Sequence, residues 1–268
     1  MATESIETAG EWDRFDRRER LLRYVALLGT VLLTYVSWQA LNVRYSYLVT
    51  APEMTLNLFR RMYPPDATYA PEIVAPMIAT INIAVVGTIL AIVMAIPVAY
   101  LGARNTTPNR YTYGLGKFLI VASRSVHVII WAIVFVIVFG TGTLAGILAV
   151  AFRSVGFLAK LISEEIEEID RTAVEAVEAT GANGLKTMLY GIVPQVKPAF
   201  IGLSVYRWDI NVREATIIGF VGAGGIGMEL QTRIDFFDWS GVLTILLAIL
   251  VVVIFSELLS AWVRGKVR

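Results

Sequence analysis

The chain has 268 residues, of which 56% are apolar and 17% charged, and its 23 basic residues nearly balance its 22 acidic ones. A mean hydropathy of +0.66 is typical of a membrane protein and not of a soluble domain. The balanced charge gives no global field that would favour a nucleic acid partner. Since there is no cysteine and His127 is the only histidine, we expect no metal site and no enzyme site.

Five arginines lie within residues 14–23, directly before a first apolar run at residues 24–41. The run is longer than the core of most signal peptides and no cleavage site follows closely, so we interpret it as an uncleaved anchor. In the loop at residues 42–72, three apolar side chains are spaced four apart: Met54, Leu58 and Met62. They predict an amphipathic helix that lies along the bilayer surface or packs on its own bundle.

Five further segments predict membrane spans; they lie at residues 73–101, 117–139, 143–162, 198–221 and 241–263. Pro97 should kink the first of these five. The sequence therefore predicts an all-α membrane protein with six transmembrane helices. We assign residues 1–72 to an N-terminal tail, the first transmembrane helix and an extracytoplasmic loop, and residues 73–268 to the transmembrane core.

The distribution of Lys and Arg predicts the orientation, because loops that stay in the cytoplasm carry the excess of basic residues. With the N-terminus inside, the inner segments hold fifteen basic residues and the outer segments four. We therefore expect a multi-pass protein of the cytoplasmic membrane, in contact with lipid, whose two termini and residues 171–194 face the cytoplasm.

The stretch at residues 171–194 is polar and lies between two predicted spans. Its first part predicts an amphipathic helix of two to three turns, with valines on one face and glutamates on the other: Val174 and Val177, Glu175 and Glu178. Gly181 follows where a left-handed residue caps a helix. Taken alone, these signals are equally compatible with a solvated helical hairpin.

The order Glu175-Ala176, Gly181 and Pro194 resembles the EAA motif of ABC-importer permeases. Three residues depart from that motif without changing its spacing: Val177, Gly191 and Val193. The resemblance implies a cytoplasmic coupling helix within residues 171–194, which docks into a groove of a separate ATPase subunit. The residues that it would use are Glu175, Ala176, Glu178, Gly181 and Ala182.

The run Ser204–Gly227, together with the acidic block Glu164–Asp170, resembles the phosphonate-importer permeases. This resemblance implies the type I ABC importer fold, a second copy of the chain around a central pore, two ATPase subunits and an extracytoplasmic binding protein. ATP and magnesium would be bound by the ATPase, so that this chain would need no cofactor. The implied cargo is a phosphonate or a related phosphorus oxyanion.

Two alternatives stay open at this point. The chain could serve another type I importer, for methionine or another small solute, or it could be an ion-coupled carrier. A carrier would have no need for residues 171–194.

Four glycines fit the pattern G-x-G-x-x-G: Gly222, Gly224, Gly225 and Gly227. A dinucleotide site would need an acidic residue about twenty positions later, within a βαβ unit. Residues 242–255 are apolar instead, so we predict a tight glycine turn. The family resemblance implies a gate loop at the outer side.

Charged residues inside the spans form the last constellation. Segment 198–221 holds Arg207, Asp209, Arg213 and Glu214, which predict either a self-neutralised structural cluster or part of a pore. Arg124 and His127 are three apart with no nearby acid, which favours a watery path that attracts anions over side chains that merely snorkel near the end of a span. The predicted pore residues are Arg124, Ser125, His127, Arg207, Arg213 and Glu214.

Overall fold

The structure is a computed structural model that describes residues 15–267, and its regular elements there are all helical. Most of the predicted N-terminal tail lies outside the described residues. Five helices are long and apolar enough to cross a membrane, and the number is six when a pair of helices bent by 91° is counted as one span. The predicted all-α fold with six spans is confirmed. The chain divides by its contacts into residues 1–57 and 58–268, whereas the boundary at residue 72 stays a prediction.

The first part of the chain holds α1 (Arg17–Ala40) and most of α2 (Ser46–Met62). Asp16 caps α1, because its carboxylate accepts a hydrogen bond from the backbone N–H of Arg17 at 2.7 Å. No side chain of α1 is buried within the structure, as expected for an apolar helix that lipid surrounds. In α2, polar side chains recur every three or four residues at Ser46, Thr50, Glu53, Asn57 and Arg60, and Arg61 follows the last of them. This stripe makes α2 amphipathic, as predicted.

The core of residues 58–268 is built on α3 (Val74–Gly102) and α6 (Thr143–Glu167). Small side chains let the two backbones approach closely, because a Cβ at Gly87 would lie 2.8 Å from a methyl of Val150. Two buried clusters contain residues of both helices. Pro97 lies inside α3, which continues past it to Gly102.

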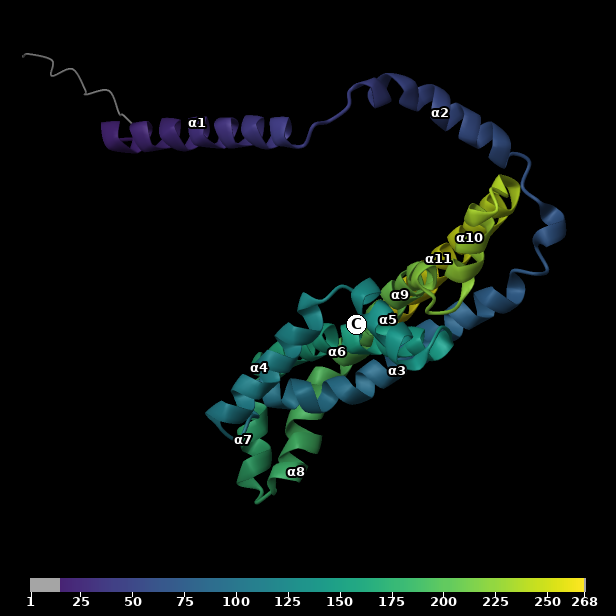
Figure 1. Ribbon diagram of the computed structural model, residues 1–268. Helices are drawn as coiled ribbons and strands as arrows, with labels where there is room; N and C mark the ends of the chain where they lie inside the picture. The colour runs from purple at the N-terminus through teal and green to yellow at the C-terminus, as the bar shows by residue number, and fades with distance from the viewer. Residues whose placement is uncertain (1–14, 268) are drawn as a thin grey trace, which may run out of the picture. The chain divides into compact units, whose positions relative to one another are not determined.

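The predicted span at residues 117–139 is not one helix. It consists of α4 (Arg110–Ser125) and α5 (Val128–Phe139), which are bent by 91°. Neither proline nor glycine occurs at the break, where Val126 adopts an extended conformation and His127 caps α5. Both helices pack against α6 (Figure 1): Ser123 of α4 hydrogen-bonds to the backbone of Phe152 and Gly156, and Trp131 of α5 contacts the ring of Phe152.

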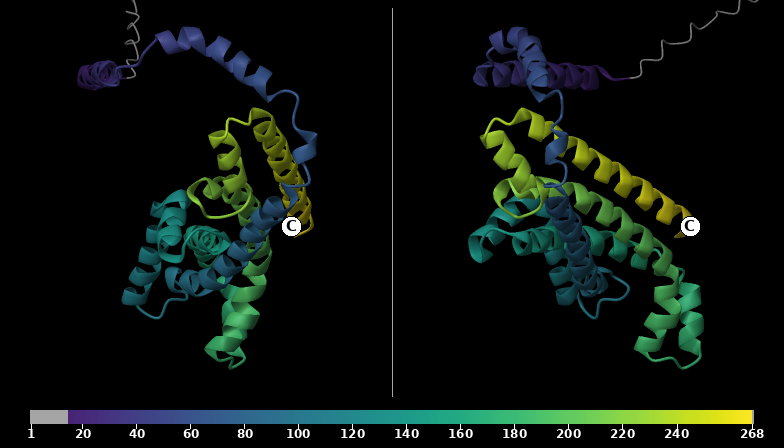
Figure 2. Two further views of the ribbon diagram at one scale, coloured as in Figure 1. Left: turned by 45° about the vertical axis from the view of Figure 1, so that its right-hand side comes forward. Right: turned by 90° about the vertical axis from the view of Figure 1, so that its right-hand side faces the viewer.

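The polar stretch forms a helical hairpin. It comprises α7 (Arg171–Ala179), a turn, α8 (Gly184–Thr187) and a π-helical segment at Met188–Ile192 that leads into α9 (Val193–Ile218). Gly181 has a φ of +80°, so the predicted left-handed cap is confirmed. The α7–α8 hairpin projects from one end of residues 58–268, and α10 lies at the opposite end (Figures 1 and 2).

The chain after α9 turns through a short 3₁₀ segment, Gly219–Val221, and a glycine-rich loop into α10 (Ile226–Asp235). The last span, α11 (Trp239–Val267), follows after a short turn. A third buried cluster joins α10 and α11 to the start of α3 and to the 3₁₀ turn Ala67–Tyr69, labelled η1.

Candidate functional site

The α7–α8 hairpin is held together mainly at its base. Asp170 caps α7 by accepting the N–H of Thr172 at 2.9 Å. The side chain of Gln195 accepts the N–H of Asp170 at 2.9 Å and donates to the carbonyl of Gly191 at 2.7 Å. These bonds tie both legs of the hairpin to the start of α9, so the hairpin is anchored to that transmembrane helix.

The predicted docking residues lie at the surface of this hairpin. Four of them are exposed and one is half-buried; they are Glu175, Ala176, Glu178, Gly181 and Ala182. A shallow hollow between the legs is lined by small side chains together with Lys186 and Tyr190. Leu185, with 66% of its surface exposed, and Tyr190, with 71%, are apolar groups that the described residues leave uncovered. The hairpin therefore presents a mixed acidic and apolar surface.

The charges of α9 are paired within the chain. Arg207 is 2% exposed and its Nη2 lies 2.8 Å from Oε2 of Glu214. Arg213 lies 2.6 Å from Asp209, which also accepts a hydrogen bond from the hydroxyl of Ser256 at 2.8 Å. The predicted pairing of Asp209 with Arg213 is confirmed, and the pairing of Arg207 with Glu214 was not foreseen.

A chain of hydrogen bonds crosses the membrane core beside this cluster. Arg207 Nε donates to Ser154 of α6 at 2.8 Å, and Ser154 donates to the amide oxygen of Asn211 at 3.0 Å. The amide nitrogen of Asn211 donates to Thr88 of α3 at 2.7 Å. Because buried polar groups must find partners in an apolar medium, these hydrogen bonds fix α3, α6 and α9 to one another.

Arg124 and His127 do not share a helix, so the expectation that they lie on one helical face is wrong. Arg124 is in the last turn of α4, whereas His127 is the N-cap of α5, with its Nδ1 accepting the N–H of Ile129 at 3.4 Å. Both side chains are exposed, as is that of Ser125, whose hydroxyl donates to the carbonyl of Val121. Among residues 15–267, no carboxylate pairs with Arg124. The three residues thus border a break in a membrane span.

The glycine-rich loop is a close-packed turn. Gly222, Gly224 and Gly225 have φ angles of +86°, +82° and +77°, a region that side chains other than hydrogen disfavour. A Cβ at Gly225 would lie 2.5 Å from Oγ1 of Thr80, which accepts the N–H of Ile226 at 2.7 Å. The fourth predicted glycine, Gly227, has a Cβ position 2.3 Å from the carbonyl oxygen of Thr216. The predicted tight turn is therefore confirmed.

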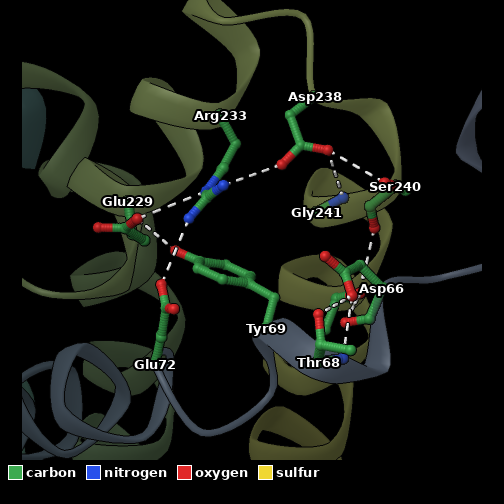
Figure 3. A network of polar contacts seen from close by, with 10 residues as sticks. Asp66, Thr68, Tyr69, Glu72, Glu229, Arg233, Asp238, Ser240 and Gly241 are labelled. Atoms are coloured by element: carbon green, nitrogen blue, oxygen red, sulfur yellow. Dashed lines mark hydrogen bonds and ion pairs between the residues drawn. The ribbon is translucent and has the colours of Figure 1, made fainter.

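A polar network lies around α10 and links it to the segment before α3 (Figure 3). Arg233 reaches Glu72 at 3.5 Å, Glu229 at 3.7 Å and Asp238 at 3.0 Å, and its guanidinium stacks 3.7 Å from the ring centroid of Tyr69. The Tyr69 hydroxyl donates to Glu229. Burial and the neighbouring Glu229 raise the pKa of Tyr69 to about 12, so the phenol stays a donor at neutral pH.

The same network sets the start of α11. Asp238 accepts hydrogen bonds from the N–H of Gly241 and the hydroxyl of Ser240, both at 3.0 Å. The Gly241 N–H is the main cause of the lowered pKa of Asp238, so the carboxylate stays charged. Sequence reasoning missed this network because its members are far apart in the chain.

Comparison with known proteins decides the family. Residues 87–268 match the family described as "Binding-protein-dependent transport system inner membrane component". The chain belongs to this family. It is a permease, the membrane component of an ABC transporter.

Two curated relatives of this permease come from Stutzerimonas stutzeri. The "Putative phosphite transport system permease protein HtxC" is 34% identical over 91% of this chain and 87% of its own length. The "Phosphite transport system permease protein PtxC" is 34% identical over 93% of this chain and 94% of its own length. Both comparisons extend well beyond the span of the family match.

A solved structure gives the same fold for this permease. A chain of the MetNI methionine ABC transporter, in an inward facing conformation, superposes with a TM-score of 0.64, at 20% identity over 73% of this chain and 96% of that one. The type I importer fold is thereby confirmed.

From the sequence alone, no role was assigned to one further charged residue of the permease, Arg153. Arg153 interrupts the apolar run of α6, and no carboxylate within the described residues pairs with it. Its Nη1 is buried without a hydrogen-bond partner. A charge in an otherwise apolar span is the signal that could have singled it out.

Proposed function

We propose that this permease moves a phosphorus oxyanion, a phosphonate or phosphite, into the cell. Two observations support the proposal. The relatives HtxC and PtxC are described as permeases of phosphite transport systems and align with nearly the whole chain. Arg124 and His127 border the helix break and have no acidic partner among residues 15–267, which suits the passage of an anion. The proposal rests mainly on the relatives, and the positions of Arg124 and His127 are consistent with it.

The path that we propose uses only some of the predicted pore residues. Arg124, Ser125 and His127 are exposed at the break between α4 and α5. By contrast, Arg207 and Glu214 neutralise each other in a buried pair, which supports a structural role for them. Arg213 is bound to Asp209 in the same way. We therefore place the anion path at the α4–α5 break.

We propose that ATP is hydrolysed by two separate ATPase subunits, which hold ATP and magnesium, and that this chain binds no cofactor of its own. The α7–α8 hairpin would be the coupling element, with Glu175 and Gly181 in the docking surface. Its anchoring to α9 through Gln195 supports this role, since a rigid projection transmits a displacement. A soluble binding protein would deliver the cargo on the opposite side.

We also propose that a second copy of the chain completes the pore, with both termini and the hairpin in the cytoplasm. The basic residues of the inner segments support this orientation. The hairpin and α10 lie at opposite ends of residues 58–268, as coupling on one side and cargo entry on the other require (Figure 2). The alternative is a complex of this chain with a different permease chain. The masses of the subunits in the purified complex distinguish the two possibilities.

The substrate is tested by transport into vesicles. The permease, its ATPase and its binding protein are reconstituted, and uptake of labelled phosphite, methylphosphonate and methionine is compared with and without ATP. We expect ATP-dependent uptake of at least one phosphorus compound and none of methionine. Uptake of methionine alone would assign the chain to another type of importer, and uptake without ATP would make it a carrier.

The docking surface is tested by Gly181→Val. A β-branched residue disfavours the φ of +80°, and its side chain would occupy open space on the docking surface, where nothing lies within 4 Å of a Cβ. We expect the permease to insert normally but to lose most of its co-purifying ATPase. Gly184→Ala is the control, because that glycine is also unobstructed but has no positive φ. Normal co-purification of the Gly181→Val permease would refute the docking assignment.

A further inference from the structure

Arg153 is an unusual residue for its place in the fold. It lies in the middle of α6, a helix of the membrane core, and is partly buried. A guanidinium is always charged and offers five N–H donors. Nevertheless, its Nη1 is inaccessible to solvent and has no hydrogen-bond partner within residues 15–267. Such a group costs free energy unless an acceptor from outside the chain completes it.

No acid of the neighbouring helices is left to neutralise Arg153. Another cation, Arg207, lies near enough to repel it. The two carboxylates of α9 are already engaged, Glu214 with Arg207 and Asp209 with Arg213. The cluster formed by Arg153 and these four residues therefore has an excess of one positive charge.

The contact between α4 and α6 places a second cation beside it. The N–H of Gly156 donates to the Ser123 hydroxyl at 2.9 Å, and that hydroxyl donates to the carbonyl of Phe152. The two helices are antiparallel, because Lys117, earlier in α4, lies 3.9 Å from Glu167, later in α6. Ser123 thus faces the turn between residues 152 and 156.

In an antiparallel helix pair, the residues one step beyond a mutual contact turn to the same side, since the two helices wind in opposite senses when seen from one end. Arg124 follows Ser123 and Arg153 follows Phe152. The two guanidinium groups therefore emerge on one side of the α4–α6 pair and at one level.

The start of α5 lies next to this position. Val128, the first residue of α5, packs in one buried cluster with Ala149, which is one turn from Arg153 on α6. The same cluster includes Val212 of α9, so that apolar side chains close the space on that side. The N-terminal end of a helix carries a partial positive charge, which adds to those of the two arginines. Broken helices with this arrangement bind ions near the middle of membranes.

We propose that Arg153, together with Arg124 and the N-terminal end of α5, forms an oxyanion-binding site halfway across the membrane. The inference rests on the proposed function and names the residue that would receive the cargo. A tetrahedral oxyanion offers paired oxygens to a guanidinium fork, and it supplies the acceptor that Arg153 lacks. Arg207 is a positioning residue, because its bond to Ser154 fixes the part of α6 next to Arg153.

The first test removes the charge in the full reconstituted complex. Arg153→Gln should lower ATP-dependent uptake of phosphite or methylphosphonate about tenfold or more, the effect of losing a hydrogen bond to a charged group. Arg153→Lys should recover a substantial part of the uptake. Arg110→Gln makes the same charge change at an exposed position at the start of α4 and should transport as the parent does. The amount of assembled complex, measured by gel filtration, should be equal for all three variants.

A second test avoids any dependence on folding. The chain has no cysteine, so Arg153→Cys offers one reactive thiol to reagents applied after assembly. A reagent that adds an ammonium group should restore uptake, a neutral reagent of the same length should not, and bound phosphite should slow both reactions. The parent complex treated with each reagent corrects for cysteines in the other subunits.

The outcomes separate this inference from the proposed function. If the parent complex takes up neither phosphite nor methylphosphonate, the proposed cargo is wrong. If the parent takes up either compound and the Arg153→Gln complex does so equally well, the site is wrong and the cargo stands. Equal rescue by charged and neutral reagents would likewise overturn the site, because a structural role depends on volume and not on charge.

Discussion

Two sets of intramembrane charges lie next to each other in this permease and are treated differently by the fold. The charges of α9 are paired within the chain, as in the contact of Arg207 with Glu214, and two of them, Arg207 and Asp209, are buried. Those of the α4–α6 pair, Arg124 and Arg153, have no acid to meet them among the described residues. Both sets lie at one level, because Arg207 bonds to Ser154, the residue after Arg153. Depth in the membrane therefore does not explain the difference.

The difference separates two uses of a charge in lipid. A charge with its partner in the same chain holds helices together and is costly to disturb. A charge without one is tolerated where water or a passing ion reaches it. We therefore expect substitutions in the α9 cluster to affect assembly, and substitutions of Arg124 or Arg153 to affect transport. A substitution with the opposite effect would contradict this distinction.

The largest effect is expected for Arg207→Met, which leaves the carboxylate of Glu214 without its cation. Removing one partner of a buried pair costs about 3–5 kcal/mol. We expect little folded permease in the detergent extract and a much lower thermal transition. Adding Glu214→Leu to the same chain should recover part of the stability, because two apolar residues replace the pair. A stable Arg207→Met permease that fails only in transport would move Arg207 into the anion path.

A smaller effect is expected for Arg124→Gln. The side chain is exposed and unpaired, so the folded permease should form in normal amounts. Uptake of the phosphorus compound should fall several-fold, because the path loses one of its attracting charges. ATP hydrolysis by the complex should persist. A loss of assembled complex instead of transport would show that Arg124 has a structural partner, for example in the second permease chain.

The smallest effect is expected for Ser256→Ala. The change removes one hydrogen bond from Asp209, which keeps Arg213 at 2.6 Å. A single bond of this kind contributes about 1 kcal/mol. The thermal transition should drop slightly and uptake should be unchanged. Slower uptake at unchanged stability would contradict the assignment of the α9 cluster to structure.

Local signals in the sequence predicted much of this architecture. Apolar runs gave the spans, and the turn at Gly181 followed from its position after an amphipathic helix. The pairing of Asp209 with Arg213 was predictable because residues four apart lie on one face of a helix. Each of these features depends on neighbours within about two turns of the chain.

Features that depend on tertiary contacts were not predictable. The break at Val126 and His127 contains no proline or glycine, so nothing local marks it. Because of this break, Arg124 and His127 do not lie on one helical face, contrary to the expectation from the sequence. The network around Arg233 joins residues more than 150 positions apart, such as Tyr69 and Glu229. The lone charge of Arg153 was visible, but its lack of a partner became evident only from the fold.

The close contact of α3 with α6 has a mechanical consequence. A Cβ at Gly87 of α3 would meet Val150 of α6 at 2.8 Å, so these two helices cannot slide past each other without clashes. We therefore expect α3 and α6 to move as one rigid unit when the pore changes shape. Bending is then left to the joints on either side, the kink at Val126 and the glycine turn at residues 222–225.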